Sequence, residues 1–123
     1  MSEINKKDFK VLIAEDNDSN FSLVQHILFK YNLTRVKNGV EALEKLHNEQ
    51  YDIILMDMKM PIMGGLEAVR KIREFDTKVP IIALTAYAFD SDRASAMEAG
   101  CNAFLTKPLN KSQLLGLFST KYQ

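Results

Sequence analysis

The sequence predicts an α/β fold, a doubly wound sheet of five parallel strands, (βα)5. Short apolar runs rich in β-branched residues alternate with amphipathic stretches of helical length. Three of these runs are apolar almost throughout, as strands covered on both faces are. A chain of 123 residues accommodates five such units, so we expect a single domain over residues 1–123, with its core at about residues 10–120.

The strands are expected at five apolar runs: residues 11–14, 33–36, 53–56, 81–84 and 103–105. The first, third and fourth runs lack the polar alternation of a half-exposed strand, which indicates helices on both faces of the sheet. Right-handed crossovers then bring the carboxyl ends of the strands to one edge. Doubly wound sheets bind their ligands at that edge, at the topological switch point.

Helical periodicity follows each strand. The fourth expected helix, residues 90–99, is mostly polar and ends at Gly100, which suits the left-handed conformation after a helix. The apolar positions that mark the first, second, third and fifth helices are Phe21, Val24, Leu28 and Tyr31; Val40, Leu43 and Leu46; Leu66, Val69 and Ile72; and Leu114, Leu115, Leu117 and Phe118.

Short polar side chains stand where several of these helices begin. Asn17 or Asp18 is placed to cap the first helix, and Asn110 is placed to cap the last. The pair Asn38-Gly39 is also a hairpin signal, but the apolar spacing after it is helical, which favours a helix start.

Composition and charge argue against several classes of protein. Sixteen basic residues balance sixteen acidic ones, which argues against nucleic-acid binding. Residues 1–10 lack the apolar segment of a signal peptide, and no apolar run reaches the roughly 20 residues that span a membrane. Cys101 is the single cysteine, so no intrachain disulfide can form and a reducing compartment fits. We expect a cytoplasmic protein.

Polar side chains with complementary chemistry follow four of the strands. Glu15-Asp16 ends the first strand, Asp57 the third, Thr85 the fourth and Lys107-Pro108 the fifth. If the strand order is 2-1-3-4-5, the first and third strands are neighbours and the three carboxylates share one crevice. Like charges at such distances need a cation between them. A cluster of oxygen ligands without histidine or cysteine suits Mg²⁺.

Four segments carry a resemblance to a known family. They are Val11-Leu12-Ile13-Ala14-Glu15-Asp16-Asn17, Ile54-Leu55-Met56-Asp57-Met58-Lys59-Met60-Pro61, Ala83-Leu84-Thr85-Ala86 and Thr106-Lys107-Pro108. Together they resemble the CheY-like receiver domain of response regulators, and most of all the receivers of hybrid histidine kinases. The resemblance extends from about residue 10 to the last helix. It implies a flavodoxin-like fold with the strand order 2-1-3-4-5, and a two-component phosphorelay.

The resemblance implies a metal-assisted phospho-acceptor. Asp57 would take a phosphoryl group from a phosphohistidine, which is a known carboxylate nucleophile chemistry. Asp16 and Asp57 would be Mg²⁺ ligands together with the backbone carbonyl of Lys59, and Glu15 would hold a metal-bound water. The donor would be a histidine kinase or a histidine phosphotransfer protein.

The resemblance also implies the residues of a switch. Lys107 would pair with one phosphoryl oxygen, from a cis Lys107-Pro108 bond, and Thr85 would hydrogen-bond another. Phe104 would rotate inward behind Thr85, driven by packing because it carries no hydroxyl. The surface that changes would be formed by the fourth helix, the fifth strand and the fifth helix.

The sequence departs from the family pattern at a few positions. Gly64 stands where relatives often carry Asp, so the third helix loses an N-cap and the Gly64-Gly65 loop becomes flexible. Lys59 and Tyr87 occupy positions that tune hydrolysis in the family, and we expect them to slow attack by water. His26 and His47 have no metal-ligand spacing and are expected at the surface. Cys101 is expected to be buried rather than nucleophilic.

Three functions are compared. A phospho-accepting receiver modifies itself at Asp57 and turns over no separate substrate. A degenerate receiver would bind a partner constitutively, but the five polar residues at the strand ends argue against it. A phosphatase or phosphotransferase with an aspartate nucleophile usually carries a second aspartate two residues later, where this chain has Lys59. We expect a monomer when unphosphorylated, either stand-alone or part of a larger kinase or regulator, with a protein as its downstream partner.

Overall fold

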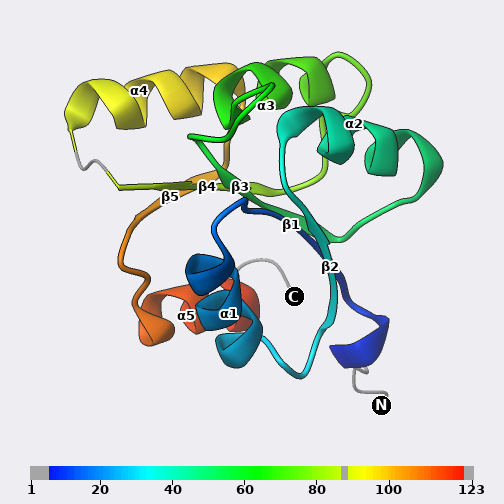
Figure 1. Ribbon diagram of the computed structural model, residues 1–123, viewed down its shortest axis with the longest axis vertical. Coiled ribbons are helices and arrows are strands. Elements are labelled where there is room, and N and C mark those ends of the chain that lie inside the picture. Colours follow the sequence, from blue (N-terminus) through cyan, green and yellow to red (C-terminus); the bar gives the residue numbers. More distant parts are fainter. Residues whose placement is uncertain (1–5, 87–88, 121–123) are drawn as a thin grey trace.

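The computed structural model describes residues 6–86 and 89–120. Its centre is a sheet of five parallel strands in the order β2-β1-β3-β4-β5, which confirms the predicted topology (Figure 1). Each strand is one residue longer than expected, so Asp57 and Thr85 are the last residues of their strands. The strands are β1 Lys10–Ala14, β2 Asn32–Val36, β3 Ile53–Asp57, β4 Ile81–Thr85 and β5 Ala103–Thr106.

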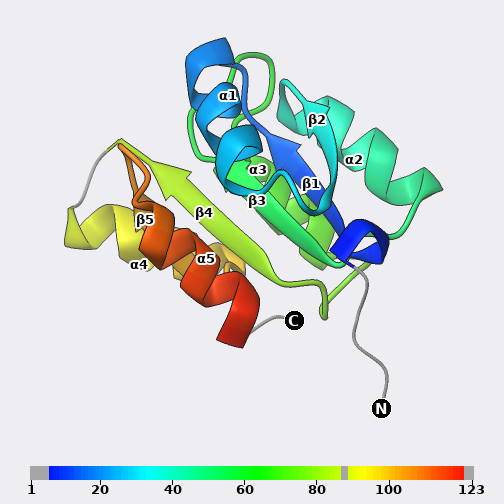
Figure 2. The same cartoon turned by 90° about the horizontal axis from the view of Figure 1, so that it is seen from below.

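Helices cover both faces of this sheet. The segments α2, α3 and α4 lie on one face, and α1 and α5 lie on the other (Figure 1). Seen from below, α5 lies beside β4 and β5 (Figure 2). The helices are α1 Asp18–Ile27, α2 Gly39–Asn48, α3 Gly65–Arg73, α4 Asp90–Ala99 and α5 Lys111–Thr120, preceded by a short 3-10 turn, η1 Lys6–Asp8.

Two apolar cores explain why the strands are apolar almost throughout. Successive side chains of a strand point to opposite faces of the sheet. In β1, Leu12 joins the core beneath α2, α3 and α4, whereas Ile13 joins the core beneath α1 and α5. Both side chains are fully buried, and each burial contributes about 1.5–3 kcal/mol relative to exposure. A polar residue at either position would therefore lose contacts on a covered face.

Asparagine side chains cap three of the helices. Asn110 was expected as a cap, and of the two candidates for the first helix the cap is Asn17 and not Asp18. The side-chain oxygens of Asn17, Asn38 and Asn110 each accept a hydrogen bond from the backbone N–H three residues later, at 2.9, 2.9 and 3.0 Å. Asn38-Gly39 therefore begins a helix and not a hairpin. The helix α1 ends at Ile27, although the apolar spacing continues to Tyr31. Leu28 and Tyr31 lie after the helix and are buried in the core.

Candidate functional site

Three carboxyl side chains converge at the carboxyl edge of the sheet, where β1 and β3 are paired neighbours. Glu15 and Asp16 follow β1, and Asp57 ends β3. One carboxylate oxygen from each of the three lies within 4.8 Å of the others. Glu15 and Asp57 are buried and Asp16 is exposed, so the cluster has a buried floor and a rim that faces solvent.

Lys107 lies against the two buried carboxylates. Its Nζ donates a hydrogen bond to Asp57 Oδ2 at 3.1 Å and lies 2.8 Å from Glu15 Oε1. The Lys107–Pro108 peptide bond is cis, as the resemblance implied. Burial lowers the pKa of Lys107, but the contacts with Glu15 and Asp57 outweigh burial and raise it above the ordinary value. Lys107 is therefore a fixed positive charge in the crevice.

Asp57 is held in an environment that disfavours its charge. Burial, followed by the neighbouring Glu15 carboxyl, raises the pKa of Asp57 to about 6. The backbone N–H of Lys59, at 3.1 Å from Asp57 Oδ1, and the Lys107 ammonium act in the opposite direction. The upward effects win, so the folded protein disfavours a charge on Asp57 when no cation is bound.

The chemistry of the donor atoms fits a divalent cation. Glu15 Oε1 is buried and, apart from its ion pair with Lys107, has no hydrogen-bond partner among the described residues. The other oxygen of Glu15 accepts from the backbone N–H of Asn17 at 3.2 Å. The cluster supplies carboxylate oxygens from Glu15, Asp16 and Asp57, which is the ligand type that Mg²⁺ prefers.

Gly65 has a role in the site that sequence reasoning missed. Its N–H donates to the carbonyl of Met58 at 3.2 Å, and a Cβ at this position would lie 2.2 Å from the carbonyl oxygen of Asp57. Glycine therefore allows the first turn of α3 to pack directly on the end of β3. Gly64 is the N-cap of α3 and makes no side-chain cap hydrogen bond, as expected. The glycine pair in the sequence signals a special position, but it does not distinguish close packing from flexibility.

Thr85 ends β4 beside the acidic cluster and is buried. Its carbonyl accepts a hydrogen bond from the backbone N–H of Lys107 at 2.7 Å, so the two residues are joined through the main chain. A cavity of about 210 Å³ lies next to Thr85, and it is lined by Met58, Lys59, Leu66, Thr85, Asp92 and Ser95. Thr85 thus lies beside the carboxylates and also lines an open hollow that is shared with α4.

Phe104 lies one strand further from the acids, on β5, opposite Ala83 of β4. The ring is half-buried and packs against the core beneath α2, α3 and α4. The guanidinium of Arg93, from α4, lies over the ring at 5.2 Å from its centroid. Tyr87, which was expected to affect hydrolysis, lies outside the described residues.

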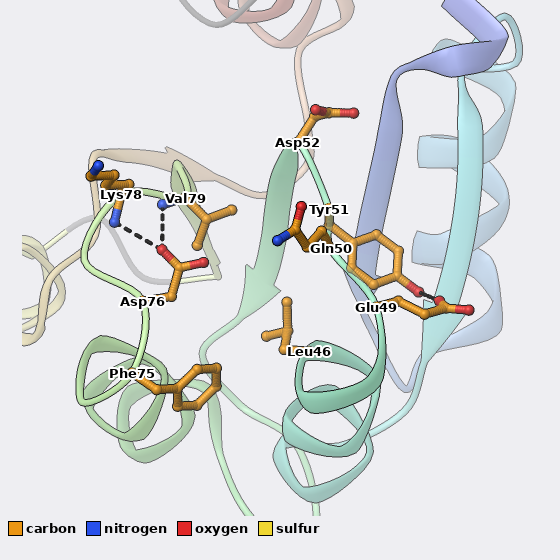
Figure 3. A pocket seen from close by; sticks show the side chains of 9 residues that line it. All are labelled: Leu46, Glu49, Gln50, Tyr51, Asp52, Phe75, Asp76, Lys78 and Val79. Atoms are coloured by element: carbon orange, nitrogen blue, oxygen red, sulfur yellow. Dashed lines mark hydrogen bonds between the residues drawn. The ribbon is translucent and has the colours of Figure 1, made fainter.

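A larger hollow, of about 480 Å³, lies at the opposite edge of the sheet, before β3 and β4 (Figure 3). Its acidic side chains already have partners: Glu49 accepts from the Tyr51 hydroxyl, and the two aspartates hold backbone groups. Asp76 accepts from the backbone N–H of Lys78 and Val79, and Asp52 accepts from the N–H of Lys10. These bonds order the loops before the strands, so we interpret the carboxylates of this hollow as structural.

The remaining candidate side chains behave as the sequence suggested. His26 is exposed, and His47 stacks on Phe75 with ring centroids 4.4 Å apart. Cys101 is buried, and burial raises the pKa of its thiol to about 11, which disfavours the nucleophilic thiolate. Within the described ranges, none of the helices is both long and apolar enough to cross a membrane.

Comparisons with known proteins agree with this geometry. Residues 11–118 match the family model of the response regulator receiver domain. The chain is 40% identical to hybrid signal transduction histidine kinase I of Dictyostelium discoideum over 91% of its own length, which is 7% of that kinase. It is 35% identical to the polar-differentiation response regulator DivK of Brucella anthropi, over 81% of this chain and 85% of the regulator.

A solved structure gives the same picture. The receiver domain of a sensor histidine kinase from Pseudomonas aeruginosa PAO1, which has a magnesium ion coordinated in its active-site cleft, superposes with a TM-score of 0.81. It is 37% identical, and the match covers 88% of this chain and 92% of that one. The strand order, the acidic edge and these similarities lead to one conclusion: the chain belongs to the response regulator receiver domain family.

Proposed function

We propose that Asp57 accepts a phosphoryl group from a phosphohistidine donor in a two-component phosphorelay. A carboxylate oxygen of Asp57 would attack phosphorus, the bond from phosphorus to the imidazole nitrogen would break, and the freed imidazole would leave with the electron pair. The product is an aspartyl phosphate. The observation that carries this proposal is the convergence of three carboxylates and the Lys107 ammonium in one crevice.

The neighbouring residues divide the work of positioning and charge neutralisation. We propose that Asp16, Asp57 and the Lys59 carbonyl hold Mg²⁺ directly and that Glu15 holds a metal-bound water. The cation would supply neutralisation of charge on the transferring group. Lys107 would pair with one phosphoryl oxygen, and the Thr85 hydroxyl would donate to another. Both side chains already lie at the edge where charge develops, so little reorganisation is needed.

A small phosphodonor tests this proposal without a partner protein. With acetyl phosphate and Mg²⁺, the intact mass should rise by one phosphoryl group, and Asp57→Asn should abolish the increase. Asp52→Asn is a matched control, because Asp52 lies just before β3 at the opposite end of the same strand. Labelling that persists in Asp57→Asn, or that is independent of Mg²⁺, contradicts the proposal.

Further proposals follow from the same assignment. We propose that the chain forms one receiver domain over residues 1–123 that modifies only itself, is monomeric before phosphorylation and acts in the cytoplasm. The donor would be a histidine kinase or a histidine phosphotransfer protein, and the face formed by α4, β5 and α5 would change for a protein partner. A degenerate receiver with constitutive binding remains the alternative. For a degenerate receiver, the affinity for the partner protein should be the same in the wild type and in Asp57→Asn.

A further inference from the structure

A contact between α4 and β5 joins two residues that the phosphoryl chemistry does not use directly. Arg93, in the first half of α4, places its guanidinium over the ring of Phe104 at 5.2 Å from the centroid. Arg93 is exposed, and Phe104 is half-buried against the core beneath α4. The guanidinium therefore covers the ring from the helix side, and inward movement of Phe104 would break this cation–π contact.

The carboxyl-terminal end of α4 is attached firmly. Arg73 of α3 donates through Nε to the carbonyl of Gly100 and through Nη2 to Asn102 Oδ1, each at 2.9 Å. The buried side chains of α4, Ala96 and Ala99, also belong to its second half. This end of the helix is thus fixed to α3 and to the start of β5.

The amino-terminal half of α4 has a different environment. Its N-cap is Phe89, whose side chain is 66% exposed. Asp92 from this half of the helix, together with Ser95 just after it, lines the open hollow of about 210 Å³ that Thr85 also lines. The Arg93–Phe104 contact is thus one of the links between this half of α4 and β5.

We propose that Arg93 is a positioning residue that holds Phe104 in the observed conformation. It would thereby set how much of the unmodified protein has Phe104 rotated inward. This inference rests on the proposed function, because it concerns the conformation that phosphorylation of Asp57 would favour and that is disfavoured before Asp57 is modified. A cation–π contact at an exposed site shifts an equilibrium constant by about two- to five-fold. When the conformation that binds a phosphoryl mimic is a minor population of the protein, the apparent affinity for that mimic changes by the same factor as this population.

The test measures the affinity for beryllofluoride, a mimic of the phosphoryl group, in the presence of saturating Mg²⁺. Arg93→Ala should bind it about two- to five-fold more tightly than the wild type, while the affinity for Mg²⁺ alone stays the same. Arg70→Ala is the matched control, because Arg70 is an exposed arginine on the neighbouring helix α3, and it should change neither affinity.

A double-mutant cycle with Phe104→Leu separates the contact from general electrostatics. If Arg93 acts through the ring, Arg93→Ala has no further effect in the Phe104→Leu background. A change of the same size in both backgrounds contradicts the proposal, because it would come from charge alone. An unchanged affinity in Arg93→Ala contradicts it as well.

A readout on the free protein distinguishes failure of this inference from failure of the proposed function. After labelling with 4-fluorophenylalanine, Phe104→Leu identifies the fluorine signal of Phe104. Arg93→Ala should move that signal in the unmodified protein, in the direction in which beryllofluoride moves it in the wild type. If the wild type does not bind beryllofluoride with Mg²⁺, the proposed function is wrong. If it binds and the signal in Arg93→Ala does not move, the role of Arg93 is wrong.

Discussion

Lys107 Nζ lies 3.1 Å from Asp57 Oδ2, although fifty residues separate the two in the sequence. β4 lies between β3 and β5 in the sheet, so the side chain of Lys107 reaches across the end of β4 to meet Asp57. The same ammonium lies 2.8 Å from Glu15 Oε1. A phosphoryl group on Asp57 would therefore meet a positive charge that the fold has already placed.

Replacing this lysine should separate metal binding from phosphorylation. We expect Lys107→Met to reduce the rate of phosphorylation by acetyl phosphate by at least about ten-fold, because a charge-assisted partner of the transferring group is lost. Mg²⁺ should still bind, because the three carboxylates remain. Rates from intact mass and Mg²⁺ affinities from calorimetry check both expectations. Lys111→Met, at the exposed start of α5, is the control, and an equal loss there contradicts the specific role.

Asp57→Asn should stabilise the metal-free protein above neutral pH. Folding raises the pKa of Asp57 from 3.8 to about 6, so the folded state prefers the protonated carboxyl. The contribution of Asp57 to stability is then fully present below about pH 4 and is lost as pH rises through 6, by at most about 3 kcal/mol before solvent screening reduces it. The Asn variant carries no such charge. Its free energy of unfolding should exceed that of the wild type above pH 7 in EDTA.

The difference between these two proteins should shrink towards pH 4, where the wild-type carboxyl is protonated in the folded state. Thermal denaturation from pH 4 to 8 measures it, and added Mg²⁺ should stabilise the wild type more than the variant. Stability curves that run parallel over the whole pH range would contradict the assigned environment of Asp57.

Gly65→Ala should disturb the site through the backbone. The added Cβ would lie 2.2 Å from the Asp57 carbonyl oxygen, so the start of α3 has to shift. We expect a loss of about 1–3 kcal/mol in the free energy of unfolding, measured in urea, together with slower phosphorylation. Gly116→Ala is the matched control, because a Cβ there meets no atom within 4 Å. As a helical position it should gain about 0.5–1 kcal/mol.

Cys101 should react slowly with alkylating reagents in the folded protein. Burial raises the pKa of its thiol from 9.0 to about 11, so at pH 8 the thiolate population falls by about 100-fold. Iodoacetamide labelling should be at least that much slower in the native protein than in urea. An engineered thiol at the exposed start of α4, Ser91→Cys in a Cys101→Ser background, should label rapidly. Equal native rates would contradict the burial of Cys101.

The fold was predictable because its signals are local. The apolar runs of β1, β3 and β4 indicate burial on both faces without knowledge of their neighbours, and Gly100 ends α4 where expected, with a positive φ of 124°. The helical spacing after Asn38-Gly39 likewise outweighed a competing hairpin signal. In each case the deciding interaction lies within a few residues of the signal.

Contacts that depend on tertiary distance were not predictable. The sequence marks Gly65 as unusual but does not contain its distance from the Asp57 carbonyl. In the same way, Arg93 looks like a solvated residue until α4 is packed beside Phe104. The strand ends were predictable as a group because the topology alone brings them to one edge, whereas the ion pairs of Lys107 required the geometry.

The central claim is that Asp57 is the residue that carries the phosphoryl group. The most direct measurement treats the protein with acetyl phosphate and Mg²⁺, reduces the acyl phosphate with borohydride, and maps the product by peptide mass spectrometry. Reduction converts a phosphorylated aspartate to homoserine. We predict homoserine at position 57 alone. Modification at Asp16, or phosphate on His26 or His47 with Asp57 unchanged, would contradict the account.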